Sequence, residues 1–403
     1  MAGITVEAGA LMRALSRTLA AVDRRPTVPI LATVYLVSSG CQLTIAGANL
    51  EMEIRAQLPA VGELPATCVN PRVLRDLLKG LPASECVTLE TGESGATLRV
   101  QIGEEDWSLR TLPVEDWPAF FAELEGQLAE VRLDAGWIGD VLARVAPFMS
   151  TEDTRYYLNG VLLEAEGDKL LAVATNGAQL GRVERTVPEA ATAISAAGFV
   201  GLKSSCIIPS DMVRAVLAHI RGPVTVALSS APLVCRVEGD GLTITGKLID
   251  GVYPDYRRIL EEPKDIGYEI DRLSLLSALA RLKAISSRGG DPIVSICWRK
   301  GRLFLERRDA EIGMASIPVP GTTLGTWPNI PLHFDRARLA MAVQQIRGSA
   351  FRLQGGNSPY SQAQLIDVSD PASTFILMPM RGETALPHEP PVPPAEPEVR
   401  AAE

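Results

Sequence analysis

Cysteine and histidine are scarce in this chain of 403 residues, and neither residue type is spaced as a metal site requires. No CxxC pair occurs, and most of the cysteines fall in apolar, strand-like stretches. We therefore expect reduced core cysteines in a cytoplasmic protein rather than disulfides. The absence of clustered ligands also predicts no metal site and no cofactor. The six cysteines are Cys41, Cys68, Cys86, Cys206, Cys235 and Cys297, and the three histidines are His219, His333 and His388.

Long apolar runs are missing as well. No stretch of 18 or more apolar residues occurs, which predicts no transmembrane helix. Residues 11–22 contain Arg13 and Arg17, as an arginine-rich targeting helix would. The same helical pattern recurs downstream without a cleavage site, so a structural helix is the better interpretation.

Catalytic motifs are also absent. Residues 241–247 fit the first seven positions of a phosphate-binding loop, but Leu248 occupies the eighth position, where a hydroxyl would bind magnesium. Carboxylate pairs such as Glu104 and Glu105 are common on any acidic surface. No GxSxG, HExxH or dinucleotide motif occurs. A non-enzymatic protein is therefore expected.

A repeated unit is the main positive feature of the sequence. Six times, an apolar strand is followed by a polar residue and then by an amphipathic helix. The helices are predicted to begin near Glu7, Asn70, Asp134, Ser210, Asp271 and Asp335, in steps of 63, 64, 76, 61 and 64 residues. Short alternating segments, typical of antiparallel strands, lie between them. The predicted fold is α+β, with three repeated domains that each place two helices on antiparallel sheets.

These helices are basic although the chain has a net charge of −9. An acidic protein that concentrates cations on one structural element usually presents that element to a polyanion. The third helix is the poorest, with Arg144 alone. The basic residues are Arg13, Arg17, Arg72, Arg75, Lys79, Arg144, Arg214, Arg221, Arg272, Arg281, Lys283, Arg336, Arg338 and Arg347.

Three sequence segments are distinctive. Residues 154–160 read TRYYLNG, residues 247–258 read KLIDGVYPDYRR, and residues 377–381 read LMPMR. Together they strongly resemble the bacterial sliding clamp family, the β subunit of DNA polymerase III, and the resemblance runs collinearly from about residue 4 to 381. It implies three domains, and boundaries near residues 124–128 and 260–264 give domains at residues 1–125, 126–258 and 259–381. Residues 382–403, with six prolines, five glutamates and no apolar periodicity, are predicted to be a disordered tail.

The resemblance implies a head-to-tail homodimer closed around duplex DNA, with sequence-independent phosphate contacts. The positions that match family DNA contacts are Arg25, Arg72, Tyr156 and Tyr157. Glu152 replaces a residue that is often neutral and polar in the family, which argues against a DNA contact there.

A hydrophobic pocket that captures short peptides of polymerases, the clamp loader and repair proteins is the second implied feature. Ala178 and Gln179 replace a His-Arg pair of many relatives, which predicts a wider wall, less charge and an altered ranking of partners. The matching positions are Leu158, Thr175, Gly177, Leu180, Pro254, Arg258, Ile259, Ile376, Leu377, Met378, Pro379, Met380 and Arg381.

At the implied dimer interface, Trp107 and Leu109 of the first domain and Ile285 of the third match family positions. Opposite charges on the two edges favour head-to-tail closure. The acidic edge contains Glu104, Glu105 and Asp106, and the basic edge contains Lys300, Arg302, Arg307 and Arg308.

Two functional hypotheses share this fold. The first is a non-catalytic processivity factor that encircles DNA and tethers replicative and repair polymerases. The alternative is a specialised or mobile-element-borne second clamp with altered partner specificity, which the departures around Ala178 and the tail motivate.

Overall fold

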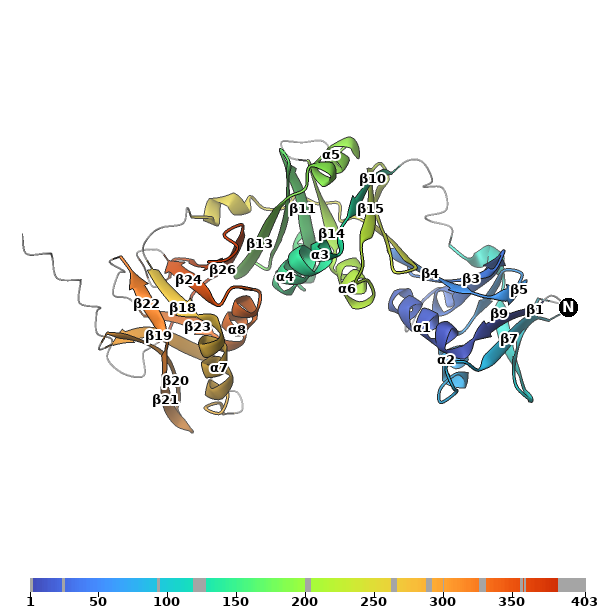
Figure 1. Ribbon diagram of the computed structural model, residues 1–403, viewed down its shortest axis with the longest axis horizontal. Helices are drawn as coiled ribbons and strands as arrows, with labels where there is room; N and C mark the ends of the chain where they lie inside the picture. Colours follow the sequence, from blue (N-terminus) through green and yellow to red (C-terminus); the bar gives the residue numbers. More distant parts are fainter. Residues whose placement is uncertain are drawn as a thin grey trace, which may run out of the picture. The chain divides into compact units, whose positions relative to one another are not determined.

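The computed structural model describes residues 3–23, 26–92, 95–118, 128–199, 204–261, 267–287, 292–299, 301–325, 331–355, 358 and 360–382. The chain forms two compact units, of which unit 1 comprises Met1–Ala143, Gly160–Leu170 and Thr186–Gly251 (Figure 1). Unit 2 comprises Arg144–Asn159, Leu171–Arg185 and Val252–Glu403. Almost all of the predicted tail, residues 383–403, lies outside the described residues.

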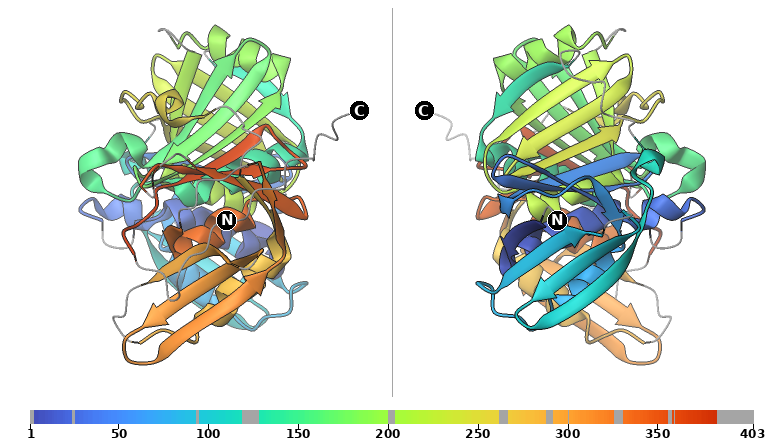
Figure 2. Two further views of the ribbon diagram at one scale, coloured as in Figure 1. Left: turned by 90° about the vertical axis from the view of Figure 1, so that its left-hand side faces the viewer. Right: turned by 90° about the vertical axis from the view of Figure 1, so that its right-hand side faces the viewer.

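Unit 1 is built on a long antiparallel sheet in the order β10-β15-β16-β17-β4-β3-β2-β6-β9-β8-β7-β1-β5. Strand β17 pairs with β4 through Ile244 and Ile54, which joins the yellow-green and blue parts of the sheet (Figure 2, right). A further pair, β11 (Gly160–Glu166) and β14 (Ser204–Pro209), also belongs to this unit. The strands of the long sheet are β1 (Gly3–Glu7), β2 (Val34–Ser39), β3 (Gln42–Ala48), β4 (Met52–Pro59), β5 (Val61–Gly62), β6 (Thr67–Val69), β7 (Cys86–Thr91), β8 (Thr97–Ile102), β9 (Glu105–Leu112), β10 (Ala129–Leu133), β15 (Val224–Ser230), β16 (Leu233–Gly239) and β17 (Leu242–Lys247).

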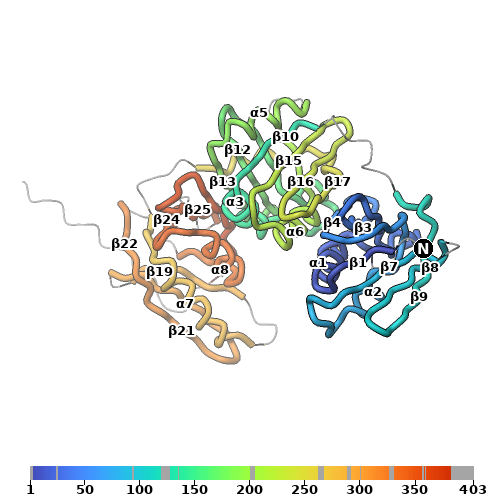
Figure 3. The backbone as a smooth tube through the Cα atoms, turned by 45° about the vertical axis from the view of Figure 1, so that its right-hand side comes forward, coloured from blue at the N-terminus to red at the C-terminus, as the bar shows by residue number. Residues whose placement is uncertain are grey.

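The helices of unit 1 cover this sheet through their apolar faces. Helix α1 (Ala8–Thr18) contacts β3 and β4 and lies beside α2 (Pro71–Leu77) (Figure 3). Helix α6 (Ser210–His219) buries Met212, Val213 and Val216, as its periodicity predicts. Helix α3 (Ala135–Trp137) continues into a π-helical turn (Ile138–Leu142). Helix α5 (Pro188–Ala196), which contacts β10 and β11, is not part of the predicted repeat.

Unit 2 contains two antiparallel sheets. One runs β13-β26-β25-β24-β18-β22 and the other β21-β20-β19-β23. Helices α7 (Arg272–Leu282) and α8 (Arg336–Gln344) contact each other, and α4 (Ala143–Val145) begins at the boundary of the unit. The strands are β12 (Lys169–Thr175, which begins in unit 1), β13 (Gln179–Thr186), β18 (Gly267–Asp271), β19 (Ile293–Arg299), β20 (Arg302–Asp309), β21 (Gly313–Val319), β22 (Gly321–Leu324), β23 (Leu332–Asp335), β24 (Ala350–Gly355), β25 (Ala363–Asp367) and β26 (Ser373–Leu377).

All six predicted helix starts are confirmed to within one residue. Asn70, Asp134, Asp271 and Asp335 are true N-caps, since each side chain accepts a hydrogen bond from a backbone N–H group of the first turn. The other two helices have no side-chain cap, and Pro209 rather than Ser210 precedes α6. The predicted α+β class is confirmed.

The cysteines are free, but the expectation that they lie in the core is wrong for two of them. Cys41 and Cys86 are exposed, whereas the other four are buried. Burial raises the pKa of the Cys206 thiol to about 12 and keeps it protonated. Among the described residues, no helix is long and apolar enough to cross a membrane, and no group of three potential metal ligands occurs.

Candidate functional site

The strand register of unit 2 brings together two separate stretches of the candidate peptide-binding residues. Strand β13 pairs with β26 so that Leu180 faces Ile376, and the Met378 N–H group donates to the Ala178 carbonyl at 2.9 Å. Strand β26 also pairs with β25, with Ile376 opposite Gln364. The segment that follows β26 is therefore fixed beside the β12–β13 turn.

That turn is held by its own side chains. The Thr175 hydroxyl donates to the Gln179 carbonyl at 2.7 Å and accepts from the Gly177 N–H group at 3.1 Å. Asn176 Oδ1 accepts from the N–H groups of Ala178 and Gln179 at 3.0 and 3.1 Å. Gly177 has a φ of +89°, a conformation that L-residues rarely adopt, which explains why glycine stands here.

The candidate peptide-binding residues divide into a buried support and an exposed surface. The buried members are Leu158, Thr175, Leu180, Ile376 and Leu377, and the exposed members are Gly177, Pro254, Arg258, Ile259, Met378 and Arg381. Pro379 and Met380 are half-buried. Only the exposed and half-buried members are available to a ligand, so they define the candidate contact surface.

Two exposed apolar residues near this surface are absent from the sequence prediction. Val252 is 89% exposed two residues before Pro254, and Tyr360 is 58% exposed with the Arg381 guanidinium 5.8 Å from its ring centroid. Exposed apolar side chains mark binding sites when they gather. Tyr360 lies in a turn without apolar periodicity, so no sequence signal identifies it.

Strand β23 fixes the end of the contact surface. The His333 carbonyl accepts from the Met380 N–H group at 2.7 Å, and His333 Nδ1 lies 2.7 Å from the Ser295 hydroxyl. A Cβ atom on Gly382 would come within 2.9 Å of the imidazole, so the backbone passes directly over the ring. Burial lowers the pKa of His333 and favours its neutral form.

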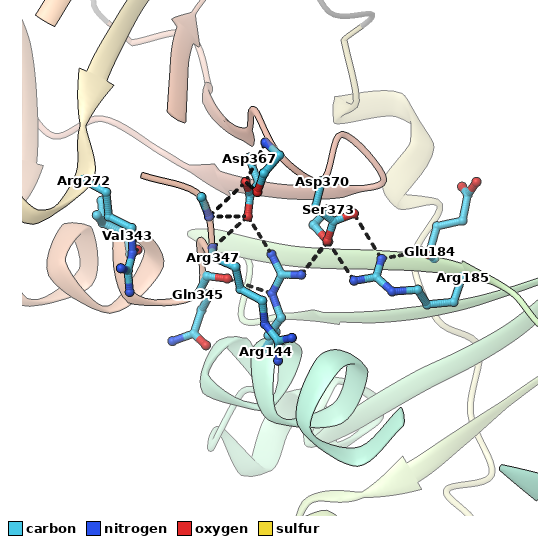
Figure 4. Close-up of polar contacts among 12 residues, drawn as sticks. Arg144, Glu184, Arg185, Arg272, Val343, Gln345, Arg347, Asp367, Asp370 and Ser373 are labelled. Atoms are coloured by element: carbon cyan, nitrogen blue, oxygen red, sulfur yellow. Dashed lines mark hydrogen bonds and ion pairs between the residues drawn. The ribbon is translucent and has the colours of Figure 1, made fainter. Parts of the chain in front are cut away.

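Arg144 does not lie on a polar helix face, which corrects the sequence prediction. Its side chain is 4% exposed and lies in a polar network under the β25–β26 connection (Figure 4). Arg144 Nη1 donates to Asp370 at 2.7 Å and to Ser373 at 2.9 Å, and Nε donates to the Gln345 carbonyl at 2.7 Å. A buried guanidinium cannot contact a DNA phosphate, so Arg144 has a structural role.

The same network holds two carboxylates of the β25–β26 connection. Asp370 also accepts from Arg185 Nη2 at 2.8 Å, so two guanidinium groups share one carboxylate. Asp367 is fully buried and accepts from the backbone N–H groups of Arg347 and Ser369 at 2.7 and 3.0 Å. Because β26 leads directly into Met378, the network anchors one end of the strand that supports the contact surface.

Asp370 makes the stability of unit 2 sensitive to acid. Burial raises the pKa of Asp370, but hydrogen bonds from Ser373, Arg144 and Arg185 outweigh burial and lower it below its ordinary value of about 3.9. The charged carboxylate therefore contributes stability above about pH 4, and this contribution is lost as the pH falls through the folded-state pKa.

We expect Asp370→Asn to be less stable than the wild type at pH 6 and to lose less further stability between pH 5 and pH 3. Thermal unfolding followed by circular dichroism at each pH measures this difference. Asp168→Asn, at an exposed carboxylate, is the control and should follow the wild-type curve. An equally steep acid loss in Asp370→Asn would show that Asp370 does not carry the effect.

The candidate DNA-contact residues are exposed where they are described. Arg72 is exposed in the first turn of α2, whereas Arg25 lies outside the described residues. Tyr156 is 54% exposed in the 3-10 helix Asp153–Leu158, and its ring meets that of Tyr157 edge-on at 5.8 Å. Apart from Arg144, every basic helix residue predicted from the sequence is exposed or half-buried.

The candidate dimer residues lie on strand and helix edges. On β9, Trp107 is 43% exposed and Leu109 is half-buried, and Ile285 is half-buried just after α7. The basic edge is weaker than predicted, because Arg307 is 3% exposed and donates to the Ser286 hydroxyl at 3.1 Å. Lys300 lies outside the described residues, while Arg302 and Arg308 are exposed.

Comparisons with known proteins find similar proteins over nearly the whole length of the chain. Residues 2–121 match the N-terminal domain family of the DNA polymerase III beta subunit, and residues 133–255 match its central domain family. The chain is 30% identical over 393 residues to the beta sliding clamp of Pseudomonas putida, covering 94% of this chain and 99% of that protein. The Caulobacter vibrioides beta sliding clamp is 28% identical over 383 residues, with the same coverage.

Solved structures show the same likeness. The crystal structure of the Caulobacter crescentus beta sliding clamp superposes with a TM-score of 0.84 at 27% identity, covering 94% of this chain and 99% of that chain. The Pseudomonas aeruginosa sliding clamp bound to griselimycin gives a TM-score of 0.82 at 27% identity, with the same coverage.

Fold and comparisons together define a sliding clamp, a class of non-catalytic processivity factors in DNA replication. The chain belongs to the bacterial DNA polymerase III beta subunit family, the beta sliding clamps. The specialised second clamp is not favoured, because the relatives matched over their full length are named as beta sliding clamps.

Proposed function

We propose that the chain acts in the cytoplasm as a DNA sliding clamp that two copies form by closing head to tail around duplex DNA. Residues 1–125, 126–258 and 259–381 serve as its three domains. Trp107 and Leu109 of one copy meet Ile285 of the other at each interface. The acidic edge with Glu104 supports this orientation, although Asp106 is already paired with Arg99 at 2.7 Å.

The observation that carries the proposal is the exposed apolar surface beside the β12–β13 turn in a chain of the clamp family. A short peptide would bind over Met378 and Ile259, with the buried members of the set as support. Methionine suits such a surface because its flexible thioether adapts to different partners. Replicative and repair polymerases and the clamp loader would all use it.

A primer-extension assay tests this function. The purified chain should lengthen the products of a replicative polymerase only when clamp loader and ATP are present, on a primed circular template. Deleting residues 376–381 should abolish the effect. Stimulation without loader or ATP would contradict a ring that has to be opened and closed around DNA.

The DNA contact by Arg72 has its own test. Arg72→Ala should lower the affinity of the assembled clamp for duplex DNA equally for different sequences, and should reduce the slope of log K against log salt by about 1. Filter binding or fluorescence anisotropy across a salt series measures both. Arg132→Ala, at an exposed arginine on strand β10, is the control and should leave the slope unchanged.

A further inference from the structure

The β12–β13 turn has a cation beside it that the sequence comparison with the family did not predict. The expectation was that Ala178 and Gln179 remove charge from this wall. Instead, a Cβ atom built on Gly177 would lie 2.6 Å from Nη1 of Arg155, so the guanidinium rests directly over the glycine. Only a residue without a side chain permits this approach.

Glu152 holds that guanidinium. Its Oε2 atom accepts from Arg155 Nε at 3.0 Å and lies 2.7 Å from Nη2, which leaves the Nη1 end directed at Gly177. Arg155 is 37% exposed and Glu152 is 57% exposed, so the pair is accessible to a ligand. The carboxylate offsets the positive charge without covering Nη1.

The backbone around Glu152 is fixed, and this sets the direction of its side chain. The Ser150 hydroxyl accepts from the Glu152 N–H group at 3.1 Å. The Glu152 carbonyl accepts from Arg155 N–H and from Asn159 Nδ2, both at 3.2 Å. These three hydrogen bonds close the turn and fix the backbone of Glu152. The fixed backbone limits the rotamers of the side chain and so favours the placement of its carboxylate beside Arg155.

We propose that Glu152 determines the charge preference of the peptide-binding surface by positioning and neutralising Arg155 over Gly177. This inference rests on the proposed peptide-binding function. With the pair intact, Nη1 donates to an uncharged acceptor of the peptide, such as a carbonyl, and a carboxylate gains little. Without the charge of Glu152, the positive charge of Arg155 is no longer offset and attracts an anionic group. The natural partners are therefore apolar peptides that are uncharged where they meet Gly177.

Three probes test this proposal. They are one apolar pentapeptide with both ends blocked, the same peptide with a carboxylate at its N-terminal end, and the same peptide with a carboxylate at its C-terminal end. Fluorescence anisotropy with the full chain should give similar affinities for all three. Glu152→Gln should bind one of the two charged probes about two- to fivefold more tightly than the wild type does, and 0.5 M salt should remove that gain.

Two further variants separate the proposal from a structural effect. Asp211→Asn breaks an ion pair of the same spacing, Asp211 with Arg214 at 2.9 Å, and should leave all three affinities unchanged. Arg155→Gln in the Glu152→Gln background should abolish the preference for the charged probe. Unchanged probe ratios in Glu152→Gln would overturn the inference, whereas failure of the wild type to bind any probe would instead contradict the proposed peptide-binding function.

Discussion

Replacing Arg144 by alanine should destabilise unit 2 by about 3–5 kcal/mol, because the substitution removes the guanidinium that pairs with the buried Asp367 carboxylate. Asp367 is fully buried, whereas Asp370 is partly exposed and would keep its ion pair with Arg185. For a unit of roughly 150–250 residues, a loss of this size lowers Tm by about 6–20 °C. Calorimetry measures the Tm, and hydrogen exchange of residues 363–377 shows where protection is lost.

Arg185→Ala is the matched control for this prediction. Its side chain is 27% exposed, and it pairs with the same Asp370 oxygen at 2.8 Å. Since Arg144 would remain, we expect a smaller loss, about 1 kcal/mol. If Arg185→Ala proves as damaging as Arg144→Ala, burial of Arg144 is not the source of its contribution.

Met378→Ala should lower the affinity of the chain for clamp-binding peptides by tenfold or more. Met378 is 41% exposed and its backbone N–H group is bonded to the Ala178 carbonyl, so its side chain starts from a fixed backbone position in the candidate contact surface. Truncation of a central apolar anchor typically costs about 2 kcal/mol or more of binding free energy. Titration calorimetry with a peptide from the cognate polymerase measures this loss.

Met314 provides the control for Met378. It is 49% exposed on β21, outside the candidate peptide-binding residues, so Met314→Ala removes a similarly exposed methionine from the same unit. Its peptide affinity should equal that of the wild type. The unfolding temperature of Met378→Ala should fall much less than that of Arg144→Ala, because Met378 lies at the surface and not in the core. A normal peptide affinity in Met378→Ala would place the contact surface elsewhere.

Local signals in the sequence predicted the helix starts and the buried helix faces well. Helix starts follow from residues such as Asn70 and Asp271, whose side chains bond their own first turn. The buried face of α6 follows from the spacing of Met212, Val213 and Val216. These features depend on neighbours within a few residues, so periodicity and capping chemistry are sufficient to identify them.

Features that depend on distant partners could not be predicted. Arg144 stands at a helical position like the other basic residues, and its burial depends on Asp370, 226 residues later. The burial of Arg307 was not predicted either, since its partner Ser286 lies 21 residues earlier in the loop that follows α7. The position of the Arg155 guanidinium over Gly177 could not be predicted either, because Arg155 lies in a separate turn of the folded chain.

Arg144 is synthesised long before Asp370, the carboxylate that it shares with Arg185. At ordinary rates of protein synthesis, about 5–20 residues per second, the 226 residues between Arg144 and Asp370 take roughly 11–45 s to appear. During that interval the Arg144 guanidinium lacks Asp367 and Asp370, and β13 lacks its neighbour β26. Completion of unit 2 therefore waits until β26 has been synthesised, and a chain that stops before β26 cannot form the candidate contact surface.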